Sequence, residues 1–300
     1  MTTLHAGTMF RLGKRTLFLA TPLALSLIFT AASRAQILHS QDPLPAFEAA
    51  TIKPFKDPPS NWHQPGADEV YLAPMSAGGL IEFAYRLPPG STARVLNAPK
   101  WIDSDLYEVD GKINPALAAA MQKMPLQQQI ERRRLLLQSL LQERFQLKVH
   151  FETRVLPVYA LTTAEKGAKL APAKDLPPLD PSQPAQPRNP DNLRNSLMIA
   201  PKGGQQFEMI ARGETMDQFA TMLTPHPEIG GRPVVNRTGL TSAYDFTMDW
   251  TREQGAAAAG DDSGPGLFTA LQQQLGLKLV PGRAPVEVLV IDSISHPSEN

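Results

Sequence analysis

Two groups of ionisable side chains have a spacing that could support catalysis. The first is His150 with Glu152, which lie two residues apart in a segment of alternating polarity. Side chains at that spacing share one face of a strand, so the pair could relay a proton. The alternative is a solvated charge ladder that continues through Lys148 and Arg154, and the pattern favours the ladder.

The second group is acidic. Asp103, Asp105 and Glu108 could serve a hydrolase that uses carboxylates. A calcium loop would need several more oxygen ligands and a distal glutamate, so Asp103-Ser104-Asp105 predicts a turn ahead of a strand. Asp261–Gly264 is better explained as a solvated loop.

The sequence lacks the residues or motifs that other common catalytic mechanisms need. The chain has no cysteine, which excludes thiol catalysis and disulfides. No two of its six histidines have metal-ligand spacing, and no serine lies in a G-x-S-x-G motif. The glycine-bearing segment Gly230–Leu240 leads into a strand, so it predicts a short strand and a tight turn at Gly239 in place of a phosphate cradle. We therefore predict no catalytic, cofactor-binding or metal-ligating residue and no cofactor.

Aromatic side chains could line a ligand groove. Trp62, Trp101, Trp250 and Tyr85 are the candidates. Buried aromatic residues serve as core anchors more often than as ligand platforms, so we expect core roles.

Hydrophobic periodicity predicts the elements that hold these residues. Helical spacing covers Leu126–Arg144, and Thr215 is a fitting N-cap for a helix over Met216–Leu223. Strict alternation predicts strands over Phe145–Phe151 and Tyr244–Trp250. Val286–Ile291 is apolar on both faces, which is typical of a central, covered strand.

One stretch of the chain occurs twice. LLQSLLQERFQLKV (residues 136–149) with PVYAL (residues 157–161) returns near the C-terminus as LFTALQQQLGLKL with PVEVL. In this match Leu141 and Phe145 fall on Leu271 and Leu275, which predicts a shared buried seam. The fold class expected is α+β, with two related modules, each a small sheet with two packed helices arranged as strand, helix, strand, helix and two strands.

The predicted strands and helices extend this match towards the N-terminus. The first module contains Glu69–Leu72, Ala77–Tyr85, Leu106–Asp110, Leu126–Arg144 and Val158–Thr162; the second contains Phe207–Ile210, Met216–Leu223, Tyr244–Trp250 and Leu267–Gln274. Phe47–Lys53 is an additional strand, which could pair with an edge of either module.

The chain divides into four regions. Residues 1–35 have a basic start, an apolar run over Thr16–Phe29 and small residues before a cleavage site after Ala35, which predicts a signal peptide. A membrane anchor is the alternative, but the run is short for a span. Residues 36–170 and 198–300 are the two modules, and the proline-rich residues 171–197 join them. We expect an exported protein, periplasmic or extracellular, with no transmembrane segment after cleavage.

Several ordered blocks resemble a known family. They are FEAATIKP, LIEFAYRL, APKWIDSDLYEVDGKI, RRRLLLQSLLQERFQLKVHFETRVLPVYALTTAEKGAKL, GRPVVNRTGLTSAYDFTMDW, GLFTALQQQLGLKL and PVEVLVIDSISHPSEN. Together they resemble the soil-associated family of exported bacterial proteins, a domain-of-unknown-function family with no assigned activity. Asn236 departs from the family pattern, which usually has Asp there. The segment from Thr215 to Leu223 with Arg237–Tyr244 also resembles the short N-terminal domain of secretins and TonB-dependent receptors, which makes protein contacts.

These observations favour an exported binding or protein-interaction module of the cell envelope over an enzyme. Its partner would be an unknown envelope or extracellular protein or ligand; the balanced charge shows no nucleic-acid footprint. The alternative is a secreted hydrolase acting on cell-wall or environmental polymer, and a third possibility is a structural envelope protein. A deep pocket with two carboxylates roughly 5–10 Å apart would favour the hydrolase.

Overall fold

The computed structural model describes residues 37–39, 43–57, 63–174, 196–252 and 264–297. All of them belong to one compact unit, Ser33–Asn300. The expected signal peptide and most of the proline-rich stretch lie outside the described residues. No helix within the described ranges has the length and apolar character needed to cross a lipid bilayer.

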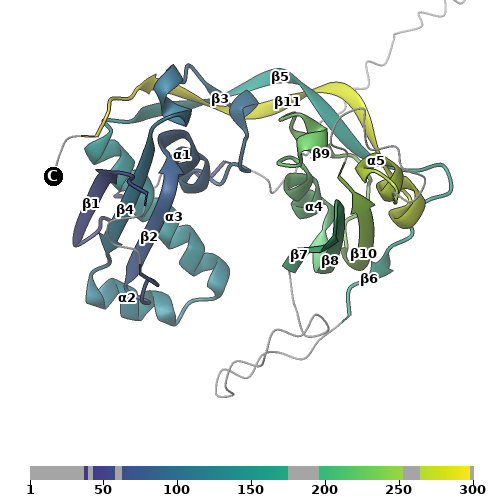
Figure 1. The fold of residues 1–300 in the computed structure, drawn as a ribbon, viewed down its shortest axis with the longest axis horizontal. Helices are drawn as coiled ribbons and strands as arrows, with labels where there is room; N and C mark the ends of the chain where they lie inside the picture. Colours follow the sequence, from purple (N-terminus) through teal and green to yellow (C-terminus); the bar gives the residue numbers. More distant parts are fainter. Residues whose placement is uncertain (1–36, 40–42, 58–62, 175–195, 253–263, 298–300) are drawn as a thin grey trace, which may run out of the picture. The chain divides into compact units, whose positions relative to one another are not determined.

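The described residues form five α-helices and eleven strands, which confirms an α+β fold (Figure 1). The helices are α1 (Ala77–Ala84), α2 (Pro115–Gln122), α3 (Leu126–Arg144), α4 (Met216–Leu223) and α5 (Leu267–Ala270), the last continuing into a π-helical turn, η6 (Leu271–Leu275). The strands are β1 (Ala49–Pro54), β2 (Glu69–Ser76), β3 (Val95–Leu96), β4 (Leu106–Lys112), β5 (Lys148–Thr163), β6 (Ala171–Pro172), β7 (Ser196–Gly203), β8 (Gln206–Thr215), β9 (Val234–Asn236), β10 (Ala243–Thr251) and β11 (Leu277–Ser293).

The strands make three sheets. Their orders are β1-β4-β2, β6-β10-β8-β7 and β3-β11-β5-β9. The third sheet is built on one long antiparallel pair, β5 with β11, in which Leu277 lies opposite Thr163 and Ser293 opposite Lys148. Two short strands extend this pair in parallel, β9 beside β5 and β3 beside β11.

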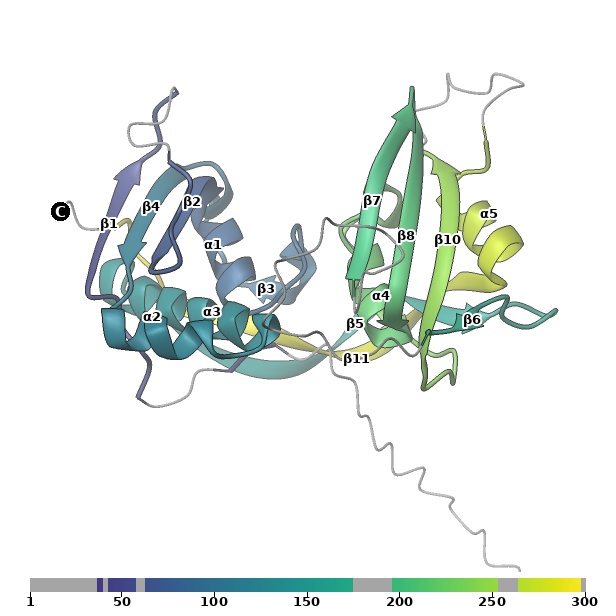
Figure 2. The ribbon, with the colours of Figure 1, turned by 90° about the horizontal axis from the view of Figure 1, so that it is seen from below.

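The first core packs α1 and α3 against β1, β4 and the far end of β11 (Figure 2). Leu137 and Leu141 of α3 are fully buried, as the helical spacing of its leucines predicts. α3 ends at Arg144 with Phe145 as its C-cap, and Gln146 then takes a left-handed conformation with φ 52°. Gly78 in α1 lies close to the turn before β4: a Cβ there would lie 2.3 Å from Asp103 Oδ1, so the Asp103 side chain would have to move.

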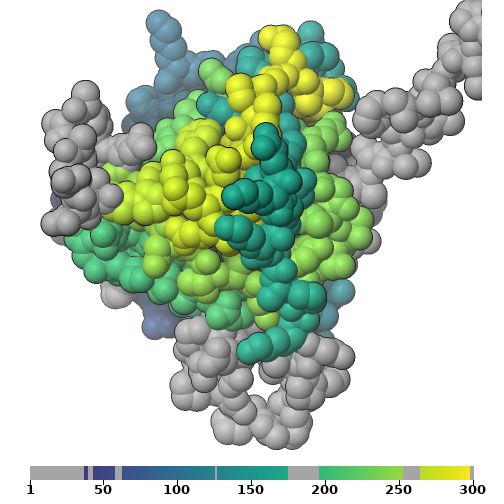
Figure 3. Space-filling model, turned by 90° about the vertical axis from the view of Figure 1, so that its right-hand side faces the viewer, coloured from purple at the N-terminus to yellow at the C-terminus, as the bar shows by residue number. Residues whose placement is uncertain are grey.

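The second core packs α4, α5 and η6 against β8, β10 and the start of β11. Thr215 caps α4 in a capping box with Gln218, which confirms the predicted N-cap. In Figure 3 the teal segment that follows β5 lies against the yellow segment around α5. Gly276 has φ 63°, and its approach to that segment is so close that a Cβ would lie 2.1 Å from Gly167 O.

β5 and β11 each contribute to both cores. β5 places Leu161 in the second core and packs Val149 against the first, while β11 places Leu277 in the second and Leu289 in the first. The prediction that a helix is followed by two strands was therefore wrong, because one continuous strand follows each helix. Pro157 does not interrupt β5, because it lies where the strand needs no N–H donor.

Most other predicted elements are confirmed. α3 and α4 have the predicted bounds, β10 and β11 contain the predicted alternating and covered strands, and β9 is the short strand before the Gly239 turn. The additional N-terminal strand, β1, pairs with β4 at an edge of the first sheet. Of the predicted linker, the first residues form β6 and the last residues begin β7. Of the helices and strands, α2, β3, β6 and β7 were not predicted.

Candidate functional site

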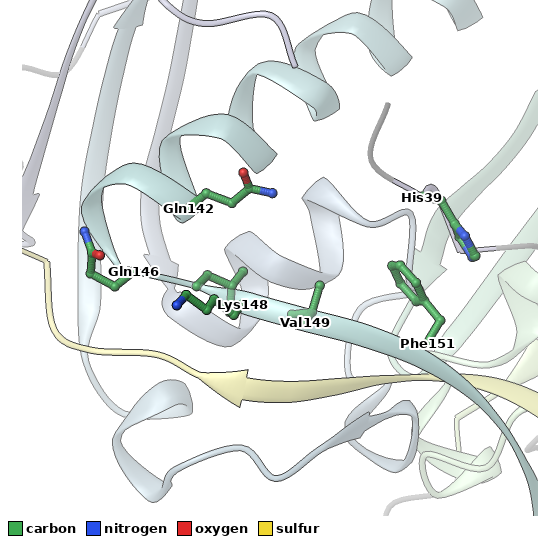
Figure 4. A pocket seen from close by; sticks show the side chains of 7 residues that line it. His39, Gln142, Gln146, Lys148, Val149 and Phe151 are labelled. Atoms are coloured by element: carbon green, nitrogen blue, oxygen red, sulfur yellow. The ribbon is translucent and has the colours of Figure 1, made fainter. Parts of the chain in front are cut away.

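The larger of the two pockets described lies between the end of α3 and the start of β5. Its volume is about 530 Å³. The lining residues are His39, Gln142, Gln146, Leu147, Lys148, Val149 and Phe151. Figure 4 shows Gln146 and Lys148 at one end, His39 and Phe151 at the other, and Gln142 reaching from α3 between them. The pocket therefore has polar side chains at its ends and an apolar floor.

The floor consists of alternate residues, Leu147, Val149 and Phe151, which share one face of the chain as it enters β5. The His39 ring stacks on Phe151 with a centroid distance of 4.0 Å and an interplanar angle of 10°. His39 Nε2 lies 2.9 Å from Glu287 Oε1 on β11. His39 is thus a fixed wall of the pocket.

The segment that carries His39 is held at three points. The Ile37 side chain is 3% exposed, and its N–H donates to Glu287 Oε2 at 3.2 Å. Leu38 donates its N–H to Tyr85 O at 2.9 Å. The Leu38 carbonyl accepts from Nε2 of the fully buried Gln138, also at 2.9 Å. Residues 37–39 therefore form a latch on the first core.

One edge of β5 beside the pocket is unpaired. Tyr159 N–H donates to Pro233 O, and Leu161 O accepts from Arg237 N–H, so these odd-numbered residues point away from β11. In an antiparallel pair this direction alternates strictly, and the β5–β11 register has no shift from Leu277 to Ile291. The N–H and C=O groups of Val149, Phe151 and Thr153 therefore also point away from β11. Within the described ranges no strand pairs with them.

Several other outward positions of the ribbon are blocked. On β5 the Val155 carbonyl accepts from Arg283 Nη2, and Pro157 has no N–H. On β11 the outward positions include Pro281 and Pro285, opposite Tyr159 and Val155.

At the next outward position of β11, a buried arginine covers the main-chain carbonyl: Arg94 Nε donates to Glu287 O at 3.0 Å. Burial lowers the pKa of this guanidinium. Prolines and covering side chains are the means by which proteins block strand edges. Among the described residues, no proline and no side-chain hydrogen bond occupies the outward groups of Val149, Phe151 and Thr153.

Lys148 supplies a cation at one end of the pocket. No ion pair or hydrogen bond joins its ammonium to the described residues. None of the residues lining the pocket is acidic. The Gln146 amide nitrogen donates to Glu143 O at 2.8 Å, which holds that side chain at the end of α3. This end of the pocket is suited to an anion.

The predicted pair His150 and Glu152 lies on the other face of β5. His150 Nε2 is 3.1 Å from Glu152 Oε1, and His150 Nδ1 is 2.8 Å from Asp292 Oδ1. Hydrogen bonds to Glu152 and Asp292 raise the pKa of His150, and the bond from His150 lowers the pKa of Glu152. Arg154 also contacts Glu152. These side chains form an exposed charge ladder and line neither described pocket, so the ladder interpretation fits better than the proton relay.

The predicted acidic group is dispersed. Ser104 Oγ donates to Trp101 O and to Asp105 Oδ1, which are turn contacts ahead of β4, as expected. Glu108 is buried and accepts from the Tyr71 hydroxyl at 3.1 Å. Asp103 contacts neither of these groups in the described hydrogen bonds, and the three acids line neither described pocket. The structure does not bring them together as a carboxylate pair in a cavity.

The aromatic candidates have separate surroundings. Trp101 stacks on His296 at 4.0 Å, and His296 Nδ1 lies 3.5 Å from Asp105 Oδ2. Trp250 and Tyr85 are buried in the two cores, as expected. Trp62 and the residues 261–263 of the acidic loop lie outside the described residues. Among described side chains, no group of three or more His, Asp or Glu residues is placed to hold a metal ion.

Sequence reasoning missed the residues of the pocket and the open edge. Lys148 was assigned to the charge ladder, and His39 was only one of several scattered histidines. The strand prolines carried a signal: Pro157, Pro281 and Pro285 all lie at positions whose main-chain groups point away from the partner strand in the β5–β11 pair. Their common direction can be recognised only when the pairing of β5 with β11 is known, and that pairing joins residues over a hundred positions apart.

Comparison with known proteins places the chain in a family. The family model described as "Protein of unknown function (DUF3738)" matches residues 78–294, which include the second core, most of the first core, β5 and β11. No curated protein and no solved structure matches the chain.

Proposed function

We propose that this chain, which belongs to the family of proteins of unknown function described as DUF3738, is a binding module that accepts an extended segment of another protein at the edge of β5. One observation carries the proposal: Val149, Phe151 and Thr153 are successive outward positions of β5 with which no strand in the described part of the chain pairs. Further along the same edge, Val155 O accepts a side-chain hydrogen bond, Pro157 has no N–H, and β9 pairs with Tyr159–Leu161. Strand addition to such an edge obtains affinity from main-chain hydrogen bonds and specificity from pockets for alternate side chains. The pocket over Val149 and Phe151 is such a receptor.

The fold supports this mode of binding. Short segments already extend the ribbon: β9 pairs with Tyr159–Leu161 of β5, and β3 pairs with Leu289 and Val290 of β11. A guest strand along Val149–Thr153 would continue the same edge that β9 occupies. It would pair with backbone groups that no described strand pairs with.

The test uses two substitutions at one position. Thr153→Pro removes an outward N–H without touching the β11 ladder, whereas Thr153→Val keeps that N–H. Both variants should fold, with melting temperatures within a few degrees of each other. Partners cross-linked to the wild type in envelope extract should be retained by Thr153→Val and lost by Thr153→Pro. Equal capture by the two variants would contradict strand addition at this edge.

We further propose export and processing as part of this function. Cleavage after Ala35 would leave Gln36 directly before the Ile37–His39 latch, so the new N-terminus would be anchored on the first core. Soil association and the likeness to secretin and TonB-receptor short domains belong to the same proposal of an envelope contact protein. N-terminal sequencing of exported protein should begin at Gln36; a retained leader would count against it.

We also infer an internal duplication. The order β2, α1, β4, α3, β5 is repeated by β8, α4, β10, α5, β11, and the buried Leu141 and Phe145 match the buried Leu271 and Leu275. Because β5 and β11 contribute to both cores, neither half should fold alone, while co-expressed fragments 36–174 and 196–300 should recover the native circular dichroism. Independent folding of either fragment would count against reciprocal dependence of the halves.

A further inference from the structure

We propose that the occupant of the β5 edge is the C-terminal end of another polypeptide, lying antiparallel to β5 with its terminal carboxylate beside Lys148. This inference rests on the proposed strand addition. It adds the direction of the guest strand, the chemistry of its last residue and the group that recognises it.

The unpaired edge of β5 ends at Lys148. Immediately before it, Leu147 N–H donates to Leu141 O, and Phe145 O accepts from Ser295 N–H at 2.8 Å. The end of α3 and the segment after β11 therefore occupy the backbone groups that would otherwise prolong the edge. A guest strand that follows β5 towards Lys148 has no further edge to pair with, which suits a chain terminus better than a continuing chain.

The direction follows from the charge at this end of the edge. A strand antiparallel to β5 reaches Lys148 with its C-terminus, whereas a parallel strand reaches it with its α-ammonium group. Lys148 has no acidic partner among the described residues, and the pocket lining contains no carboxylate. A terminal carboxylate would form a charge-assisted hydrogen bond with this ammonium, while an α-ammonium would be repelled.

The helix end at this site does not oppose an anion strongly. A helix C-terminus carries partial negative charge because its last carbonyls are unpaired. Here Leu141 O, Glu143 O and Phe145 O already accept from Leu147, Gln146 and Ser295. These bonds reduce the charge that α3 presents to the pocket.

The floor specifies the guest's side chains. In strand addition alternate residues face the same side, so the last residue and the one two places before it would lie over Leu147, Val149 and Phe151. These positions should be apolar, and the residues between them should be polar. The volume of about 530 Å³ accommodates two such side chains.

The probe is a synthetic pool of hexapeptides with Val, Ile, Leu, Phe or Tyr at the last, third-last and fifth-last positions and Thr or Ser between them. One pool has free C-termini and the other has C-terminal amides. Each is selected on immobilised mature protein and quantified by mass spectrometry. Enriched sequences are then resynthesised for fluorescence anisotropy with the wild type, Lys148→Met, Thr153→Pro and Thr153→Val.

We expect free-acid peptides to bind the wild type about tenfold more tightly than their amides, a difference typical of one charge-assisted contact. Lys148→Met should weaken binding of the free-acid peptide about tenfold and leave binding of the amide unchanged. The effects of amidating the peptide and of replacing Lys148 should therefore not add, because both remove the same contact. Thr153→Pro should abolish binding of both forms, and Thr153→Val should retain it. Unchanged melting temperatures would show that the variants are folded.

Two results would overturn the inference in different ways. Equal affinity of acid and amide, with both lost in Thr153→Pro, would refute recognition of a C-terminus but keep strand addition. Enrichment of neither pool, or binding that survives Thr153→Pro, would refute the C-terminal inference together with the proposed edge.

Discussion

Glu214 gives a prediction whose sign and size follow from its surroundings. It lies on β8 and is 4% exposed, and its carboxyl has no hydrogen-bond partner in the described contacts. Burial raises the pKa of this carboxyl from 4.5 to about 7. The folded protein therefore binds a proton at Glu214 more tightly than the unfolded chain does.

The direction follows from proton linkage. The stability associated with protonated Glu214 is fully present below about pH 4.5 and is lost as the pH rises through about 7. A shift of this size corresponds to at most about 3 kcal/mol. Relaxation and water entry reduce such costs in real proteins, so we expect Glu214→Gln to stabilise the fold by about 1–2 kcal/mol at pH 8.5 and by nearly nothing at pH 4.5.

The assay is urea unfolding at pH 4.5 and 8.5, followed by the fluorescence of the buried Trp250. Glu165→Gln makes the same change on an exposed residue and controls for net charge. A stabilisation that is equal at both pH values, or a less stable variant at pH 8.5, would refute the assignment of a buried, neutralised carboxyl to Glu214.

Three further substitutions test the packing. Gly276→Ala should destabilise the fold by at least about 3 kcal/mol, because φ is 63° and the new Cβ would meet Gly167 O. Thermal unfolding measures this loss, and the control Gly282→Ala should change the melting temperature little. Equal effects of the two substitutions would contradict this account. Ile37→Ala should cost about 2–4 kcal/mol in urea unfolding, well above the half-buried neighbour Leu38→Ala, if the N-terminal latch is part of the first core. Asn236→Asp should cost about 1 kcal/mol at pH 7, because Asn236 Nδ2 donates to Asp217 Oδ1 at 3.1 Å. Asp217→Asn should recover that loss, and no recovery would show that the pair is not responsible.

The helices were predictable because their signals are local. Leucine spacing and the Thr215 cap define α3 and α4 within a few turns of chain, and the alternation of β10 reflects one buried face. α2 was missed although Asn114 caps it and Pro115 fits its first turn. That signal was readable, but the short helix carries few of the large apolar residues that mark a period.

The candidate site was not predictable in the same way. Its pocket combines His39 with residues of α3 and β5, and its open edge is defined only by the pairing of β5 with β11. Which main-chain groups of a strand point outward depends on the neighbour with which the strand pairs. Pro157 could therefore not be assigned to the exposed edge from the sequence. The charge ladder at His150 drew attention to the opposite face of the same strand.

The central claim is that the outward amides of Val149, Phe151 and Thr153 receive a guest strand. Amide hydrogen exchange measured by NMR, with and without a selected free-acid peptide, tests it most directly. Without peptide these three amides should exchange rapidly, while those of His150 and Glu152, which point to β11, should be protected. With peptide all five should be protected. Protection of the three odd-numbered amides in the free protein, or no gain of protection at saturating peptide, would contradict the claim.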